Sequence, residues 1–157
     1  MKAFTLKELK AELTTLSPQE VTEICLRLAK YKKENKELLA YLLFNAGDEA
    51  TYISEIKAQI DEQFEGINQS NLYLTKKMLR KVLRTTNRYI KYSGSKQTEV
   101  ELLIFFLKKI KDSGIPYQRN KALENIYLRL ILRIQKTIVS LHEDLQYDYS
   151  EELKPLL

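Results

Sequence analysis

The chain has 157 residues, of which 44% are apolar and 30% charged, and this balance is typical of a folded, water-soluble protein. Four glycines and three prolines are too few for the turn-rich all-β and nucleotide-binding α/β folds. The net charge is +5, but the charges are unevenly distributed. Residues 67–136 hold sixteen Lys/Arg and four Asp/Glu, whereas Asp and Glu outnumber Lys and Arg in the segments before and after this range. A basic middle between acidic ends indicates a charged surface in that region.

Capping signals and helical apolar spacing predict an all-α fold. Thr5 with Glu8, Ser17 with Glu20, and Thr98 with Glu101 are expected to form capping boxes, and glycines follow several apolar-periodic stretches. We expect seven or eight helices in antiparallel hairpins, arranged as a compact helical bundle or a short right-handed stack like HEAT or armadillo repeats. The expected helices cover residues 5–16, 18–31, 35–46, 49–65, 71–93, 97–112, 117–146 and 150–154.

Burial is expected to differ between these helices. The run 102–107, LLIFFL, is apolar on every side of its helix, so that helix should be central. The helix over 117–146 has apolar residues on two sides, including Leu128, Leu132 and Val139, and should be covered on most sides. Cys25 is expected to be a small buried side chain, and Tyr149 to be exposed.

The chain is expected to form a single helical domain over residues 1–157. Similar residue patterns recur 61 to 64 positions apart, which suggests two three-helix units at about 17–66 and 71–141. Residues 147–157 are expected to form an acidic C-terminal tail. No apolar run is long enough to cross a bilayer, and charges interrupt the first residues, so a cytoplasmic location is expected.

The helix predicted around residues 71–92 carries the clearest functional signal. Its apolar residues fall on one half, and seven cations fall within an arc of roughly 140° on the other. The range contains no Asp or Glu to relieve the repulsion between like charges. The candidate anion-binding residues, nucleic acid being the preferred partner, are Lys76, Lys77, Arg80, Lys81, Arg84, Arg88, Lys91 and Tyr73.

Three interpretations of these cations remain open. They can bind nucleic acid; they can bind another anion, such as an acidic protein or lipid headgroups; or they can pair internally with the acidic helix at 48–66. With internal pairing, the alternative function is a protein–protein scaffold or a self-associating homo-oligomer. An enzyme is not expected, because the only histidine, His142, and the only cysteine, Cys25, belong to no catalytic motif. No metal site and no cofactor are predicted.

Overall fold

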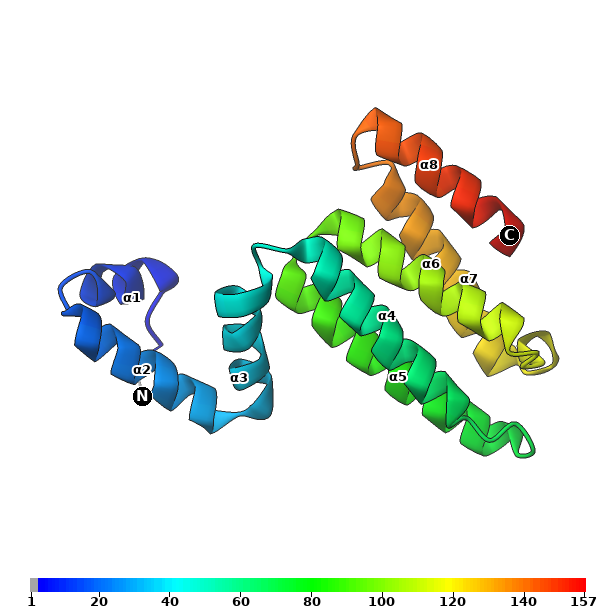
Figure 1. The fold of residues 1–157 in the computed structure, drawn as a ribbon, viewed down its shortest axis with the longest axis horizontal. Helices are drawn as coiled ribbons and strands as arrows, with labels where there is room; N and C mark the ends of the chain where they lie inside the picture. Colours follow the sequence, from blue (N-terminus) through cyan, green and yellow to red (C-terminus); the bar gives the residue numbers. More distant parts are fainter. Residues whose placement is uncertain (1–2) are drawn as a thin grey trace. The chain divides into compact units, whose positions relative to one another are not determined.

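The computed structural model describes residues 3–157, and every regular element in that range is helical, which confirms the all-α prediction (Figure 1). None of the helices described is long and apolar enough to span a membrane. The α-helices are α1 (Leu6–Leu13), α2 (Pro18–Tyr31), α3 (Lys33–Ala40), α4 (Glu49–Glu65), α5 (Leu72–Ser93), α6 (Lys96–Asp112), α7 (Lys121–Ile138) and α8 (Glu143–Leu153). Shorter elements are the π-helical turn η1 (Tyr41–Asn45) and the 3₁₀ turns η2 (Tyr117–Arg119) and η3 (Lys154–Leu156).

The chain divides into two compact units. Unit 1 is Met1–Phe44, and unit 2 is Asn45–Leu157. The boundary lies within the first of the two units expected from the sequence, residues 17–66. The single domain expected over residues 1–157 stays a prediction, and so does the repeat within it. Residues 1 and 2 lie outside the described part of the chain.

In unit 1, α2 packs against α3, and α1 and α2 begin at the predicted capping boxes. The backbone N–H of Thr5 donates to Glu8 at 2.7 Å, and that of Ser17 donates to Glu20 at 2.8 Å. These bonds satisfy N–H groups that a helix start otherwise leaves open. None of the side chains described in α1, α2 and α3 is buried.

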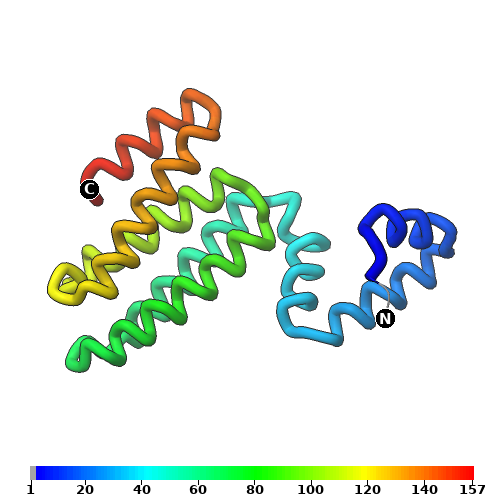
Figure 2. The backbone as a smooth tube through the Cα atoms, turned by 180° about the vertical axis from the view of Figure 1, so that it is seen from behind, coloured from blue at the N-terminus to red at the C-terminus, as the bar shows by residue number. Residues whose placement is uncertain are grey.

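Unit 2 is a helical bundle in which consecutive helices run antiparallel, and its central helix α6 packs against α4, α5, α7 and α8 (Figures 1 and 2). Leu102, Leu103 and Phe106 are completely buried, so the prediction of a central helix here is confirmed. The Phe106 ring meets Phe64 of α4 edge to face, with 5.5 Å between the ring centroids. This apolar centre fixes the faces that the surrounding helices turn to solvent.

The predicted helix over 117–146 is wrong at both ends. Residues 117–119 form the 3₁₀ turn η2, and α7 stops at Ile138, after which His142 caps the separate helix α8. The side-chain amide of Gln146 donates to the Leu141 carbonyl at 2.8 Å, which stabilises the bend between the two helices. Residues 147–157 were expected to be a tail, but α8 and η3 pack on α6 and bury Tyr149, Leu153 and Leu156.

Two further burial predictions are wrong. Leu128, Leu132 and Val139, expected to be covered, lie on the outer side of α7 and its C-terminal end and are 52%, 65% and 75% exposed. Cys25, expected in the interior, is only half-buried. In this bundle, apolar residues on a second side of a helix therefore do not by themselves show that another helix covers that side.

Candidate anion-binding face on helix α5

The local sequence sets both ends of α5. The Asn71 side chain accepts hydrogen bonds from the backbone N–H groups of Tyr73 and Leu74, at 2.9 and 3.2 Å. At the other end, Gly94 has φ +66°, a left-handed conformation that residues with a Cβ rarely adopt, and its N–H donates to the Ile90 carbonyl. The helix between these caps has 22 residues, or roughly 33 Å of length.

The side of α5 that faces the interior is defined by its five buried residues: Thr75, Leu79, Val82, Thr86 and Ile90. The two threonines satisfy their hydroxyl groups within the chain, since Thr75 donates to the Asn68 carbonyl at 2.9 Å and Thr86 to the Val82 carbonyl at 3.0 Å. At 100° per residue, this buried line lies about 160° from the centre of the cations. The packing of α5 on α4 and α6 therefore turns the cations outward.

Five of the predicted cations are exposed: Lys77, Arg80, Lys81, Arg84 and Lys91. We call these five the α5 cationic face. It extends over about 21 Å along the helix. None of the five forms an ion pair with any residue of the described part of the chain.

The remaining predicted residues lie at the margin of this face. Lys76 is half-buried, and its Nζ lies 5.7 Å from the ring centroid of Tyr73, which is itself 66% exposed. Arg88 is also half-buried, with its guanidinium carbon 5.7 Å from the centre of the Tyr89 ring. Arg88 is thus held against the protein, whereas Tyr73 presents its ring to solvent near the start of the helix.

Two acidic residues of α4, Asp61 and Glu49, have partners outside the α5 cationic face. Asp61 pairs with Lys109 of α6 at 2.7 Å. Glu49 accepts hydrogen bonds from Ser93 and from Thr98, the latter at 2.6 Å. The acids of the neighbouring helix therefore do not neutralise the five exposed cations through direct ion pairs.

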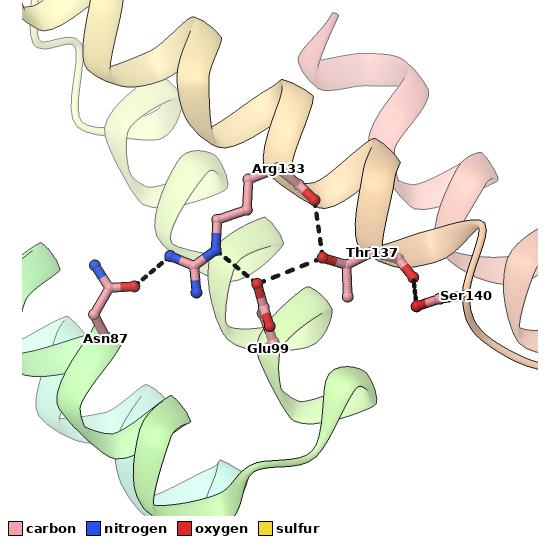
Figure 3. Close-up of polar contacts among 5 residues, drawn as sticks. All are labelled: Asn87, Glu99, Arg133, Thr137 and Ser140. Atoms are coloured by element: carbon pink, nitrogen blue, oxygen red, sulfur yellow. Dashed lines mark hydrogen bonds and ion pairs between the residues drawn. The ribbon is translucent and has the colours of Figure 1, made fainter.

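An open cleft of about 450 Å³ adjoins the C-terminal end of the α5 cationic face. Lys91 and Asn87 of α5, Glu99 of α6 and Arg133 of α7 line it. Arg133 donates from Nε to Glu99 and from Nη1 to Asn87, both at 2.6 Å, so that one side chain joins three helices (Figure 3). The positive charge of Arg133 is therefore paired with Glu99 within the bundle.

The lysines at the end of α6 have structural roles, and the helix dipole favours cations at this position. Lys108 pairs with Glu152 of α8 at 2.8 Å, and Lys111 donates to the carbonyl of Pro155. His142 Nδ1 accepts from the Asp144 N–H at 3.4 Å at the start of α8. Among the residues described, no group of three or more His, Cys, Asp or Glu side chains is placed to hold a metal ion.

Comparison of the chain with protein-family models, curated proteins and solved structures gave no match. The arrangement of charge on α5 is therefore the basis for a functional proposal.

Proposed function

We propose that this protein is a non-catalytic, cytoplasmic helical module that binds nucleic acid through the α5 cationic face. The observation that supports the proposal is a helix face with five exposed cations, no acid on the same helix, and no ion pair to the described chain. Cations at i, i+3 and i+4 repel one another at some cost to the helix. A polyanion removes that repulsion and releases the counterions condensed on its phosphates.

The recognition is expected to be insensitive to base sequence. Lysine and arginine contacts to phosphate position a protein on nucleic acid, whereas base edges carry the sequence information. Among the described aromatic residues of α5, only Tyr73 is exposed, and its ring can stack on an unpaired base. The proposal therefore favours single-stranded over double-stranded nucleic acid.

Titration of fluorescent single- and double-stranded oligonucleotides at several salt concentrations tests the proposal. The affinity is expected to fall steeply with salt, with a slope of roughly −0.7 per phosphate contacted on a single strand. The double substitution Arg80→Ala/Arg84→Ala should weaken binding and make the salt slope on a single strand shallower by about 1.4. Tyr73→Ala should weaken single-strand binding selectively.

The matched control is Lys7→Ala/Lys10→Ala, which removes the same charge from exposed positions of α1 and should leave the salt slope unchanged. No binding at low salt, or equal loss in both double variants, would contradict the proposal. Binding of vesicles with anionic lipids in place of either oligonucleotide would assign the same cations to a membrane surface.

A further inference from the structure

The open cleft beside the α5 cationic face is formed by three helices of unit 2. Asn87 and Lys91 come from α5, Glu99 from α6 and Arg133 from α7. The two 2.6 Å hydrogen bonds from Arg133, to Glu99 and to Asn87, hold the three helices together at this point (Figure 3). Every one of these contacts lies inside unit 2. We call this space the α5–α7 cleft.

Three hydrogen-bond donors at the α5–α7 cleft have no acceptor in the described part of the chain. Arg133 donates through Nε and Nη1, which leaves its Nη2 without a described partner. The Asn87 side chain takes part only through its oxygen, so its amide nitrogen is likewise unused. The third donor is the Lys91 ammonium group, which has neither a hydrogen bond nor an ion pair to a described residue. Together they offer a ligand donors from both α5 and α7.

The charge and size of the α5–α7 cleft favour a phosphate group. Glu99 is the only acid among the lining residues, and its carboxylate is already paired with Arg133. The charge of Lys91 is therefore left unbalanced, and an anion that accepts from ammonium and guanidinium groups forms strong hydrogen bonds. The volume of about 450 Å³ falls in the roughly 300–1,000 Å³ range of small-molecule sites, so one nucleotide fits.

Helix α7 extends the positive surface on the far side of the cleft. Arg129 and Lys136 lie within about 60° of Arg133 around the helix, and the bond from Arg133 to Asn87 shows that this side of α7 is turned toward α5. Both side chains are exposed, so no residue of unit 2 covers them, and neither forms an ion pair with a described residue. Glu124, the only acid of α7, lies about 150° from the centre of the three cations.

We propose that a single strand of nucleic acid passes from the α5 cationic face through the α5–α7 cleft, where Lys91, Asn87 and Arg133 bind one backbone phosphate. The strand then continues along Arg129 and Lys136. This inference rests on the proposed function and adds α7 to its binding site. A positively charged groove that follows the backbone is typical of proteins that bind single strands. A duplex is too stiff to bend one phosphate into a cleft between helices, so the path is restricted to single strands.

Titration of a fluorescent single-stranded oligonucleotide with an α7 variant tests this path. Arg129→Ala/Lys136→Ala removes two exposed, unpaired cations without disturbing a contact of the fold. It should weaken single-strand binding about tenfold at low salt and make the salt slope shallower by about 1.4. The matched control, Lys7→Ala/Lys10→Ala, removes the same charge from α1 and should keep the wild-type slope.

A second variant tests the cleft itself. Asn87→Asp adds a negative charge to the cleft but keeps an oxygen that can accept from Arg133. It should weaken single-strand binding about tenfold and change duplex binding on the α5 cationic face by no more than about twofold. Gln135→Glu makes the same change of charge at an exposed position roughly 160° around α7 from Arg133, and it should bind both oligonucleotides like wild type.

Lysine acetylation, followed by mass spectrometry, locates the strand on the unaltered protein. Bound single strand should slow the acetylation of Lys91 and Lys136 several-fold and leave that of Lys154, which follows α8, unchanged. Wild-type affinity of the α7 and Asn87→Asp variants, or a Lys136 as reactive as in the free protein, would overturn the inference. The proposed function would then stand if Arg80→Ala/Arg84→Ala still weakens binding. Absence of any oligonucleotide binding would refute both.

Discussion

The guanidinium Nε of Arg133 lies 2.6 Å from a carboxylate oxygen of Glu99, so an ion pair joins α7 to α6 at the edge of the bundle. The same arginine reaches Asn87 of α5, and Glu99 also receives a longer hydrogen bond, at 3.4 Å, from Thr137. Neither partner is fully buried, since the side chains are 39% and 20% exposed. The cluster therefore links three helices without placing an isolated charge in the core.

Replacement of Arg133 by alanine should destabilise unit 2 by about 1 kcal/mol, because a charged hydrogen-bond pair is partly screened at this exposure. Arg133→Lys should recover less than half of the loss, since lysine lacks the planar group that binds Glu99 and Asn87 together. Urea unfolding measures both values. The Lys108→Ala control removes a more exposed pair with Glu152 and should cost no more than about 0.5 kcal/mol. Equal effects at the two sites would contradict the bridging role.

The Tyr127 hydroxyl should make the stability of unit 2 sensitive to alkaline pH. It donates to the Leu156 carbonyl at 2.9 Å, and burial, with Tyr117 stacked on the ring, raises the pKa of Tyr127 from 10.0 to about 12. The folded state thus favours the neutral phenol. Its contribution to the stability of unit 2 is complete below pH 10 and is lost as the pH rises toward 12.

Tyr127→Phe should accordingly lower the stability at neutral pH by about 1 kcal/mol and reduce the further loss between pH 10 and 12. Chemical unfolding at several pH values measures this. Tyr147→Phe is the matched control, because Tyr147 is 69% exposed and should leave the pH profile unchanged. An identical profile in wild type and Tyr127→Phe would show that Tyr127 does not carry the alkaline sensitivity.

The first turn of helix α2 should become less stable at acid pH. The backbone and hydroxyl of Ser17 donate to Glu20, and these bonds hold the pKa of Glu20 below its usual value. Because the pKa of Glu20 is lowered in the folded state, its capping bonds stabilise the helix fully above the usual pKa of the carboxyl. This stabilisation is lost as the pH falls through the lowered pKa. Glu20→Ala should reduce the helicity of residues 17–31 at neutral pH and remove part of its acid dependence, as measured by NMR chemical shifts. Glu23→Ala, on the same helix without a capping bond, should retain the wild-type acid dependence.

Two apolar residues two positions apart on α7 should differ sharply in importance. Ile134 is completely buried, whereas Leu132 is 65% exposed. Ile134→Ala should cost about 2–5 kcal/mol through lost burial and a new cavity, and Leu132→Ala no more than about 0.5 kcal/mol. Thermal and urea unfolding distinguish the two. Comparable losses would mean that the outer side of α7 is covered in solution.

The sequence was sufficient for most of the features that depend on neighbouring residues. The capping box expected at Thr98 and Glu101 is wrong, because Ser95 caps α6 and accepts from the Thr98 N–H. The capping boxes at Thr5 and Ser17, the glycine end of α5 and the central position of Leu102 and Leu103 all follow from local hydrogen bonding or from apolar periodicity. The outward direction of the α5 cationic face follows in the same way. The helix phase places the cations opposite the apolar side of α5, and the packing of that side on α4 and α6 turns them outward.

Features that depend on contacts between distant residues were not predictable. The bend before His142 has neither glycine nor proline, and apolar residues continue through it at Val139 and Leu141. The burial of Tyr149 depends on α8 folding back onto α6, where its hydroxyl donates to Glu101 at 3.3 Å. Arg133 and Glu99 are 34 positions apart, and their pairing requires the α6–α7 packing to be known first.

The order of helices around α6 has a consequence for the speed of folding. The main helix contacts in unit 2 join helices that adjoin in the chain or are separated by a single helix. Few distant segments have to meet, and domains with such low contact order fold in roughly microseconds to milliseconds. Unit 2 is therefore expected to collapse quickly, with α4, α5 and α6 able to associate before α7 and α8 close the other side.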